Sequence, residues 1–172
     1  MKPNRRILVA GIGNIFWGDD AFGVEVAQRL AQRDWPAGVV VVDFGIRGLD
    51  FAYALLENYD AVILIDATQR GGEPGSLYVI EPDINQVETG EDQPLQFEAH
   101  GMVPDKSLRW AQVMGARCPF VRLVGCEPET VGSEDDMIMG LSQPVQAAIA
   151  EASRIVEQLV DEILDEQHEV VT

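Results

Sequence analysis

The sequence predicts an α/β fold, a three-layer sandwich in which a mainly parallel, twisted five-stranded sheet carries helices on both faces. Apolar runs of strand length alternate with segments of helical periodicity along the chain, as they do in βαβ units. Several of these runs are apolar without interruption, which is typical of strands covered on both faces. The chain has 172 residues and no repeat, linker or low-complexity segment, so we expect a single domain over residues 1–172.

The first half of the chain supplies three strands and two helices. Strands are predicted at 6–11, 38–43 and 61–66, each an apolar run suited to a buried position in the sheet. A helix begins near Asp19 or Asp20, either of which can cap it, and runs to about Trp35. Its apolar stripe consists of Phe22, Val26, Ala27, Leu30 and Ala31. A shorter helix is predicted at 48–59.

The middle of the chain is less regular. Residues 75–82 alternate in polarity and follow a turn too short for a crossover, so they predict one antiparallel strand. Residues 83–99 are acidic and lack periodicity, which indicates either a lid over a site or a solvated connector. We prefer the lid, because this segment ends at His100. A helix at 104–116 and a last strand at 119–125 follow.

A long helix closes the chain. Ser142 is suited to cap this helix, and Pro144 falls in its first turn. We expect the tail to fray after Asp165. The predicted apolar stripe of the helix is Val145, Ala148, Ile149, Ala152, Val156, Leu159 and Ile163.

The charge balance narrows the classes of partner. Twelve basic residues against 29 acidic ones give a net charge of −17, which would repel nucleic acid and anionic membranes and favours a metal ion or a basic peptide. No apolar run approaches the roughly 18 residues of a membrane span, and the first residues do not resemble a signal peptide. Cys118 and Cys126 would lie ~26 Å apart on an extended strand, so we expect free thiols and a cytoplasmic protein.

The first predicted strand ends in a glycine turn that resembles a dinucleotide site only in part. Gly11 and Gly13 follow the strand, and Asp43 ends the next strand, where a ribose-binding acid would lie. Position 16 is a phenylalanine rather than the glycine that the pattern needs. The adjacent carboxylates of Asp19 and Asp20 would repel a pyrophosphate at the start of the helix. A nucleotide-dependent oxidoreductase is therefore disfavoured.

Three other polar residues follow predicted strands or loops and could converge on a metal. Asp20, Asp66 and His100 offer two carboxylates and one imidazole, a set suited to Ni, Zn, Fe or Mn with positions left open. The alternative is that they are a helix cap, a turn former and a loop histidine, which are commoner roles for these residue types. His168 lies in the tail and is read as a bystander.

Several stretches of the sequence resemble motifs of one known family. The stretch GIGNIFWGDDAFGVEVAQRL looks like the opening signature of the [NiFe]-hydrogenase maturation proteases, and the likeness extends from about Arg6 to Leu164. VILIDA at 62–67, EAHGM around His100, GCEPE at 125–129 and GLSQPV at 140–145 match later motifs in the same order. The resemblance implies an endopeptidase that removes a C-terminal extension from a hydrogenase large subunit after nickel insertion.

The resemblance also implies roles for particular residues. The family's metal-binding positions correspond to Asp20, Asp66 and His100, which would engage the nickel carried by the precursor; other divalent metals could occupy the same site. Asp43 is the best candidate for an additional base or orienter, beside a catalytic part for Asp20. Asp43 begins a loop that often reads Asp-Gly-Gly-Thr in the family, but here it reads Asp-Phe-Gly-Ile.

Two further acidic residues are weaker candidates for a role in the site. Asp19 could be a base, but helix capping is the preferred interpretation. Glu127 could line the cleft or be a turn residue before Pro128, with equal support for each.

The chain lacks a Ser-His-Asp, Cys-His or H-E-x-x-H pattern, so a peptidase built from it must activate water, which a metal can do. Both cysteines are expected to pack rather than attack. The expected partner is the precursor of a [NiFe]-hydrogenase large subunit, with no nucleic acid and no membrane, and the protein is expected to be a monomer. A non-catalytic nickel-sensing chaperone of the same precursor is the alternative.

Overall fold

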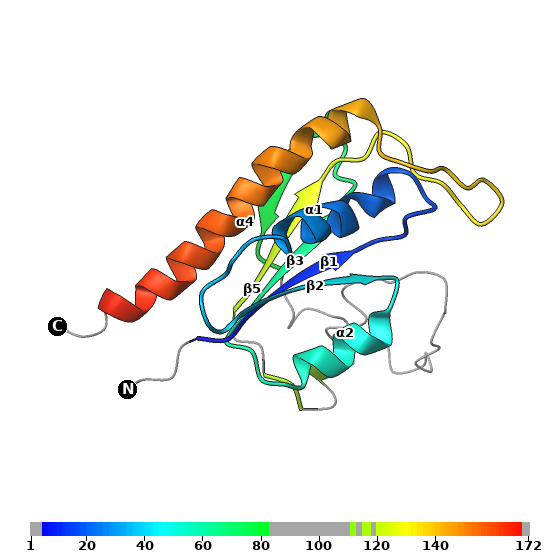
Figure 1. Ribbon diagram of the computed structural model, residues 1–172. Helices are drawn as coiled ribbons and strands as arrows, with labels where there is room; N and C mark the ends of the chain where they lie inside the picture. Colours follow the sequence, from blue (N-terminus) through cyan, green and yellow to red (C-terminus); the bar gives the residue numbers. More distant parts are fainter. Residues whose placement is uncertain (1–4, 83–110, 113–114, 118–119, 170–172) are drawn as a thin grey trace.

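The computed structural model describes residues 5–82, 111–112, 115–117 and 120–169, and in this part of the chain a five-stranded sheet lies between two layers of helix (Figure 1). The strand order is β2-β1-β3-β5-β4. The first four strands in this order run parallel, and β4 pairs antiparallel with β5. The predicted fold class is therefore confirmed, including its one antiparallel strand.

The strands and helices begin and end close to the predicted positions. The strands are β1 (Ile7–Ile12), β2 (Val39–Gly45), β3 (Ala61–Ala67), β4 (Leu77–Ile80) and β5 (Phe120–Cys126). The helices are η1 (Asp19–Ala21), a 3-10 turn, followed by α1 (Phe22–Leu30), α2 (Gly48–Leu55) and α4 (Gln143–Glu169). Of the helix predicted at 104–116, residues 111–112 are helical and most of the rest lies outside the described residues.

The predicted ends of two helices were wrong. The first helix stops at Leu30 rather than near Trp35: in place of a further helical turn, the Leu30 carbonyl oxygen accepts hydrogen bonds from the Arg33 backbone N–H (3.2 Å) and the Trp35 indole N–H (2.8 Å). Ala31 is exposed. The second helix stops at Leu55 rather than at residue 59, ahead of Asn58, whose φ of 57° is left-handed.

Two other expectations were wrong in detail. The run of valines at 39–42 forms the edge strand β2, which is only half-buried, with Val40 40% exposed. An uninterrupted apolar run thus does not by itself indicate a central strand. The terminal helix α4 also continues to Glu169, beyond Asp165, where fraying was predicted. No helix among the described residues is both long and apolar enough to cross a membrane.

The two faces of the sheet bury separate cores. Helices α1 and α4 cover one face, and α2 covers the other (Figure 1). On the α1 side a Cβ on Gly23 would lie 2.0 Å from the Ile65 carbonyl oxygen and 2.3 Å from that of Ile12, so only glycine permits this contact. The beginning of α1 is therefore pressed against the carboxyl ends of β1 and β3, which brings residues 19–20 to the same edge of the sheet.

Candidate active site

The turn after β1 folds back on itself and carries Asp20 to the carboxyl edge of the sheet. Gly13 has a φ of 143°, and a Cβ there would lie 1.8 Å from the Asp20 carbonyl oxygen, so the turn requires glycine at this position. The Asn14 backbone N–H donates to Oδ2 of Asp20 (2.7 Å). Neither Asp19 nor Asp20 caps a helix, since the residues at the helix starts are Gly18 and Ala21 and neither start has a side-chain cap.

The environment of Asp20 disfavours its negative charge. Burial raises the pKa of the Asp20 carboxyl group above its usual value, and the hydrogen bond from the Asn14 amide opposes this shift only in part. Among the described residues, that amide is the donor to this carboxylate. A partly buried carboxylate with so little compensation is a fitting ligand for a cation, because a nearby positive charge would favour its ionised form.

Asp43 and Asp66 lie near the carboxyl ends of the two strands that flank β1, β2 and β3. Gly11 of β1 pairs with Asp43 of β2 on one side and with Ile65 of β3 on the other, so both aspartates lie about one strand spacing, ~4.8 Å, from β1. Ile65 packs into the core under α1 and α4, and alternation therefore directs Asp66 towards the opposite face. The Asp43 carboxylate instead accepts a hydrogen bond from Gln28 Nε2 of α1 (3.1 Å). The two carboxylates thus leave the sheet on opposite faces.

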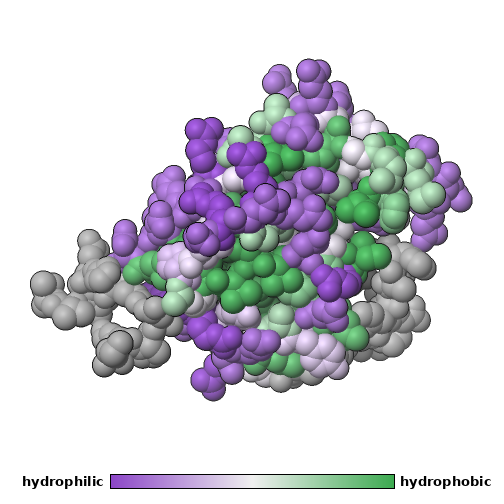
Figure 2. Space-filling model, viewed as in Figure 1, coloured by the Kyte–Doolittle hydropathy of each residue, from purple (hydrophilic) through white to green (hydrophobic). Residues whose placement is uncertain are grey.

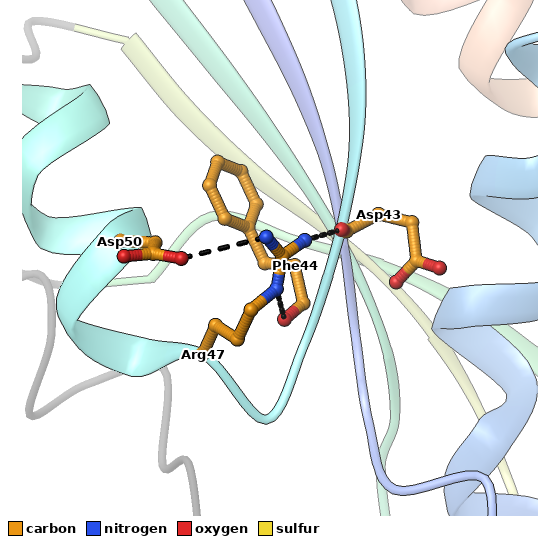
Figure 3. Close-up of polar contacts among 4 residues, drawn as sticks. All are labelled: Asp43, Phe44, Arg47 and Asp50. Carbon is orange, nitrogen blue, oxygen red and sulfur yellow. Dashed lines mark hydrogen bonds and ion pairs between the residues drawn. The ribbon is translucent and has the colours of Figure 1, made fainter.

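The end of β2 is fixed by an arginine that we did not predict. The Arg47 guanidinium donates to the carbonyl oxygens of Asp43 and Phe44, and it lies 3.4 Å from the Asp50 carboxylate (Figure 3). The Asp43 carboxylate points away from this arginine in Figure 3. Phe44 is buried against Phe51 with ring centroids 5.2 Å apart. This contact accounts for the bulky phenylalanine at the position where the family's loop often has glycine.

Asp19 is a buried anchor rather than a helix cap. Its carboxylate is fully buried and accepts hydrogen bonds from the backbone N–H groups of Glu129 (2.8 Å), Thr130 (2.9 Å) and Ser142 (2.7 Å), and from the Ser142 hydroxyl (2.8 Å). Burial by itself raises the pKa of this group, but the four hydrogen bonds outweigh burial and the pKa of Asp19 falls below its usual value. Asp19 is therefore held ionised and joins three distant segments.

Glu127 likewise anchors two neighbouring segments of the chain. Its carboxylate accepts hydrogen bonds from the backbone N–H groups of Arg70 (2.8 Å) and Gly71 (3.2 Å) and from the Tyr78 hydroxyl (2.9 Å). The Arg70 amide makes the largest contribution to lowering the pKa of Glu127. These contacts tie the segment after β3 to β4, a role that neither the cleft nor the turn interpretation anticipated.

Three side chains named in the sequence analysis fall outside the part of the chain that the structure describes. His100, Cys118 and the side chain of His168 lie outside the described residues, as does the segment 83–99. Within the described ranges no three His, Cys, Asp or Glu side chains are grouped closely enough to hold a metal ion. The convergence of Asp20, Asp66 and His100 therefore stays a prediction.

Cys126 is a packed thiol and not a nucleophile. It is a free cysteine, fully buried at the end of β5. Burial, together with the charges of Asp19 and Glu127, raises the pKa of Cys126 to about 12. We expect iodoacetamide at pH 8 to leave Cys126 unmodified in the native protein and to alkylate it in guanidinium, as measured by peptide mass mapping. Equal alkylation of the native and unfolded protein would contradict this assignment.

Comparison with known proteins gives one consistent family. A family model described as hydrogenase maturation protease matches residues 24–159. The chain is 35% identical over 158 residues to the hydrogenase expression/formation protein HupD of Rhodobacter capsulatus, across 89% of this chain and 71% of that protein.

Solved structures agree. The hydrogenase maturating endopeptidase HybD from E. coli aligns with a TM-score of 0.71 at 25% identity, over 91% of this chain and 93% of that chain. The hydrogenase 2 maturation peptidase from a Thaumarchaeota archaeon aligns with a TM-score of 0.68 at 29% identity, over 91% of this chain and 99% of that chain. Sequence and fold are thus both similar to those of maturation peptidases.

Proposed function

We propose a function from the family to which this chain belongs, the hydrogenase maturation proteases, whose members act on hydrogenase large-subunit precursors; the chain is a peptidase of that family. From this membership we propose that it removes the C-terminal extension from the nickel-loaded precursor of a [NiFe]-hydrogenase large subunit. We further propose that it acts as a monomer in the cytoplasm, a reducing compartment in which Cys126 would stay a free thiol.

The state of Asp20 is the observation that best supports a role for the precursor's nickel. Its carboxylate is partly buried at the carboxyl edge of the sheet, its pKa is raised, and the Asn14 amide supplies only one hydrogen bond. We propose that Asp20, Asp66 and His100 contact the nickel that arrives with the precursor. Two carboxylates and an imidazole suit nickel and leave coordination positions for groups of the substrate. The metal would belong to the substrate, and these side chains would detect that it is present.

Asp43 is our candidate for the base or orienter of the attacking water. Its carboxylate leaves the sheet on the α1 face, whereas Asp66 is directed to the α2 face. A scissile bond served by both would therefore lie across the carboxyl edge, over the end of β1. Gln28, which donates to Asp43, would hold the carboxylate in place while it takes a proton from water.

A cleavage assay followed by mass spectrometry tests the proposal. Purified protein is incubated with nickel-loaded precursor, and the large subunit is then weighed by mass spectrometry. We expect a shortened large subunit, because the family is one of peptidases. Retained binding without any change in mass would instead favour the nickel-sensing chaperone, since the same carboxylates could contact nickel without hydrolysis.

A further inference from the structure

A group of apolar side chains is exposed beside the candidate site. Half of the exposed large apolar residues in the described part of the chain belong to two segments, 15–16 and 131–139. We call them the apolar patch: Ile15, Phe16, Val131, Met137 and Met139, which are 42–69% exposed. Apolar and hydrophilic surface lie side by side at the end of the molecule where the loop before α4 projects (Figures 1 and 2).

Backbone hydrogen bonds build this patch. The Gly18 N–H donates to the Ile138 carbonyl (2.8 Å), and the Ile138 N–H donates to the Phe16 carbonyl (2.8 Å). Ile138 is half-buried, and in extended backbone its neighbours Met137 and Met139 project the other way, into solvent. The buried Asp19 carboxylate fixes the bases of both segments through Thr130. The exposure of these side chains is therefore a fixed feature of the fold.

An acidic rim borders the patch. Glu134, Asp135 and Asp136 are all exposed and directly precede Met137. Backbone hydrogen bonds between Ser133 and Asp136 in both directions hold them in a tight turn. A partner that covers the patch should accordingly offer apolar side chains flanked by Lys or Arg. Methionine suits such a surface, because its flexible thioether adapts to the shape of what it meets.

We propose that the apolar patch docks the hydrogenase precursor, through an apolar segment of the precursor flanked by basic residues. This rests on the proposed function and adds to it the surface that selects the substrate. The patch is continuous with the site, since Phe16 and Gly18 lead directly to Asp20. A second copy of this chain has a net charge of −17 and would be repelled by the acidic rim. The chain's own segment 83–99 is also acidic and would be repelled in the same way.

The test separates docking from chemistry. In the double variant Met137→Gln/Met139→Gln the side chains keep their length and lose their apolar character, so we expect KM for precursor cleavage to rise about tenfold with kcat unchanged. The control is Val40→Gln, which alters an exposed apolar residue outside the patch, on the edge strand β2, and should leave KM unchanged. Asp135→Asn/Asp136→Asn should raise KM a few-fold at low salt only.

Several outcomes would overturn the docking proposal. Unchanged KM in both double variants would do so, and so would a wild-type dimer that the methionine variant dissociates without any effect on KM. If the wild-type protein cuts no precursor, the proposed function fails, and a binding titration with the same precursor decides the docking surface separately. Binding that is lost in the methionine variant would then still support the patch, and unchanged binding would refute it.

Discussion

Asp20→Asn is expected to reduce kcat/KM for precursor cleavage by about 10³-fold or more while leaving the protein folded. Asparagine has the shape of aspartate and can accept the same hydrogen bond from the Asn14 amide (2.7 Å). It lacks the negative charge that we propose contacts the nickel of the precursor, so the loss should fall on the reaction rather than on the fold. Steady-state cleavage, followed by the mass of the large subunit, measures the effect.

The same substitution should not destabilise the protein at neutral pH. The folded-state pKa of Asp20 is raised above the unfolded value of 3.8, so ionisation of this carboxyl group opposes folding as the pH rises through that interval. Asparagine removes this penalty, and the Tm at pH 7 should equal or exceed that of the wild-type protein, with the difference vanishing near pH 3. Glu25→Gln, on the exposed side of α1, is the control for loss of one negative charge. Normal cleavage by Asp20→Asn would refute the site assignment.

Asp19→Ala is expected to have the largest effect on stability, lowering the free energy of unfolding by about 3–5 kcal/mol. The substitution leaves the backbone amides of Glu129, Thr130 and Ser142 and the Ser142 hydroxyl without their acceptor in a buried place. Urea denaturation measures the change. Asp34→Ala, at an exposed aspartate after α1, should change stability by less than about 0.5 kcal/mol.

Acid unfolding provides an independent check on Asp19. Because the folded-state pKa lies below the unfolded value of 3.8, the ionised carboxylate contributes stability that is fully present above about pH 4. That contribution is lost as the pH falls through the folded-state pKa. The wild-type protein should consequently lose stability more steeply below pH 4 than Asp19→Ala does. Parallel acid curves for the two proteins would contradict the anchoring role.

Local patterns predicted the strands and helices well, and tertiary contacts account for the errors. The apolar runs of β1 and β3 indicated buried strands correctly, but the valines of β2 read the same way although that strand lies at the edge. The sequence could not reveal that Asp19 binds amides more than a hundred positions away rather than the first turn of a helix. Its residue type and place before an apolar stripe fit both roles equally.

The candidate site was predictable in part for a geometric reason. Ligands gather beyond the carboxyl ends of parallel strands, and this rule identified Asp43 and Asp66 from strand ends alone. It could not identify Gln28 or Arg47, because their contacts depend on how α1 and the short connection at 46–47 pack against β2. Met137 and Met139 did leave a signal, as apolar residues within an acidic loop, and sequence reasoning overlooked it.

We propose that the precursor's nickel is detected before the peptide bond is cut. The most direct measurement incubates the wild-type protein in parallel with nickel-loaded and nickel-free forms of one precursor and determines the mass of each large subunit. We expect the shortened subunit only from the nickel-loaded precursor, because Asp20, Asp66 and His100 would otherwise meet no cation. Equal shortening of both forms, or shortening of neither, would contradict the account.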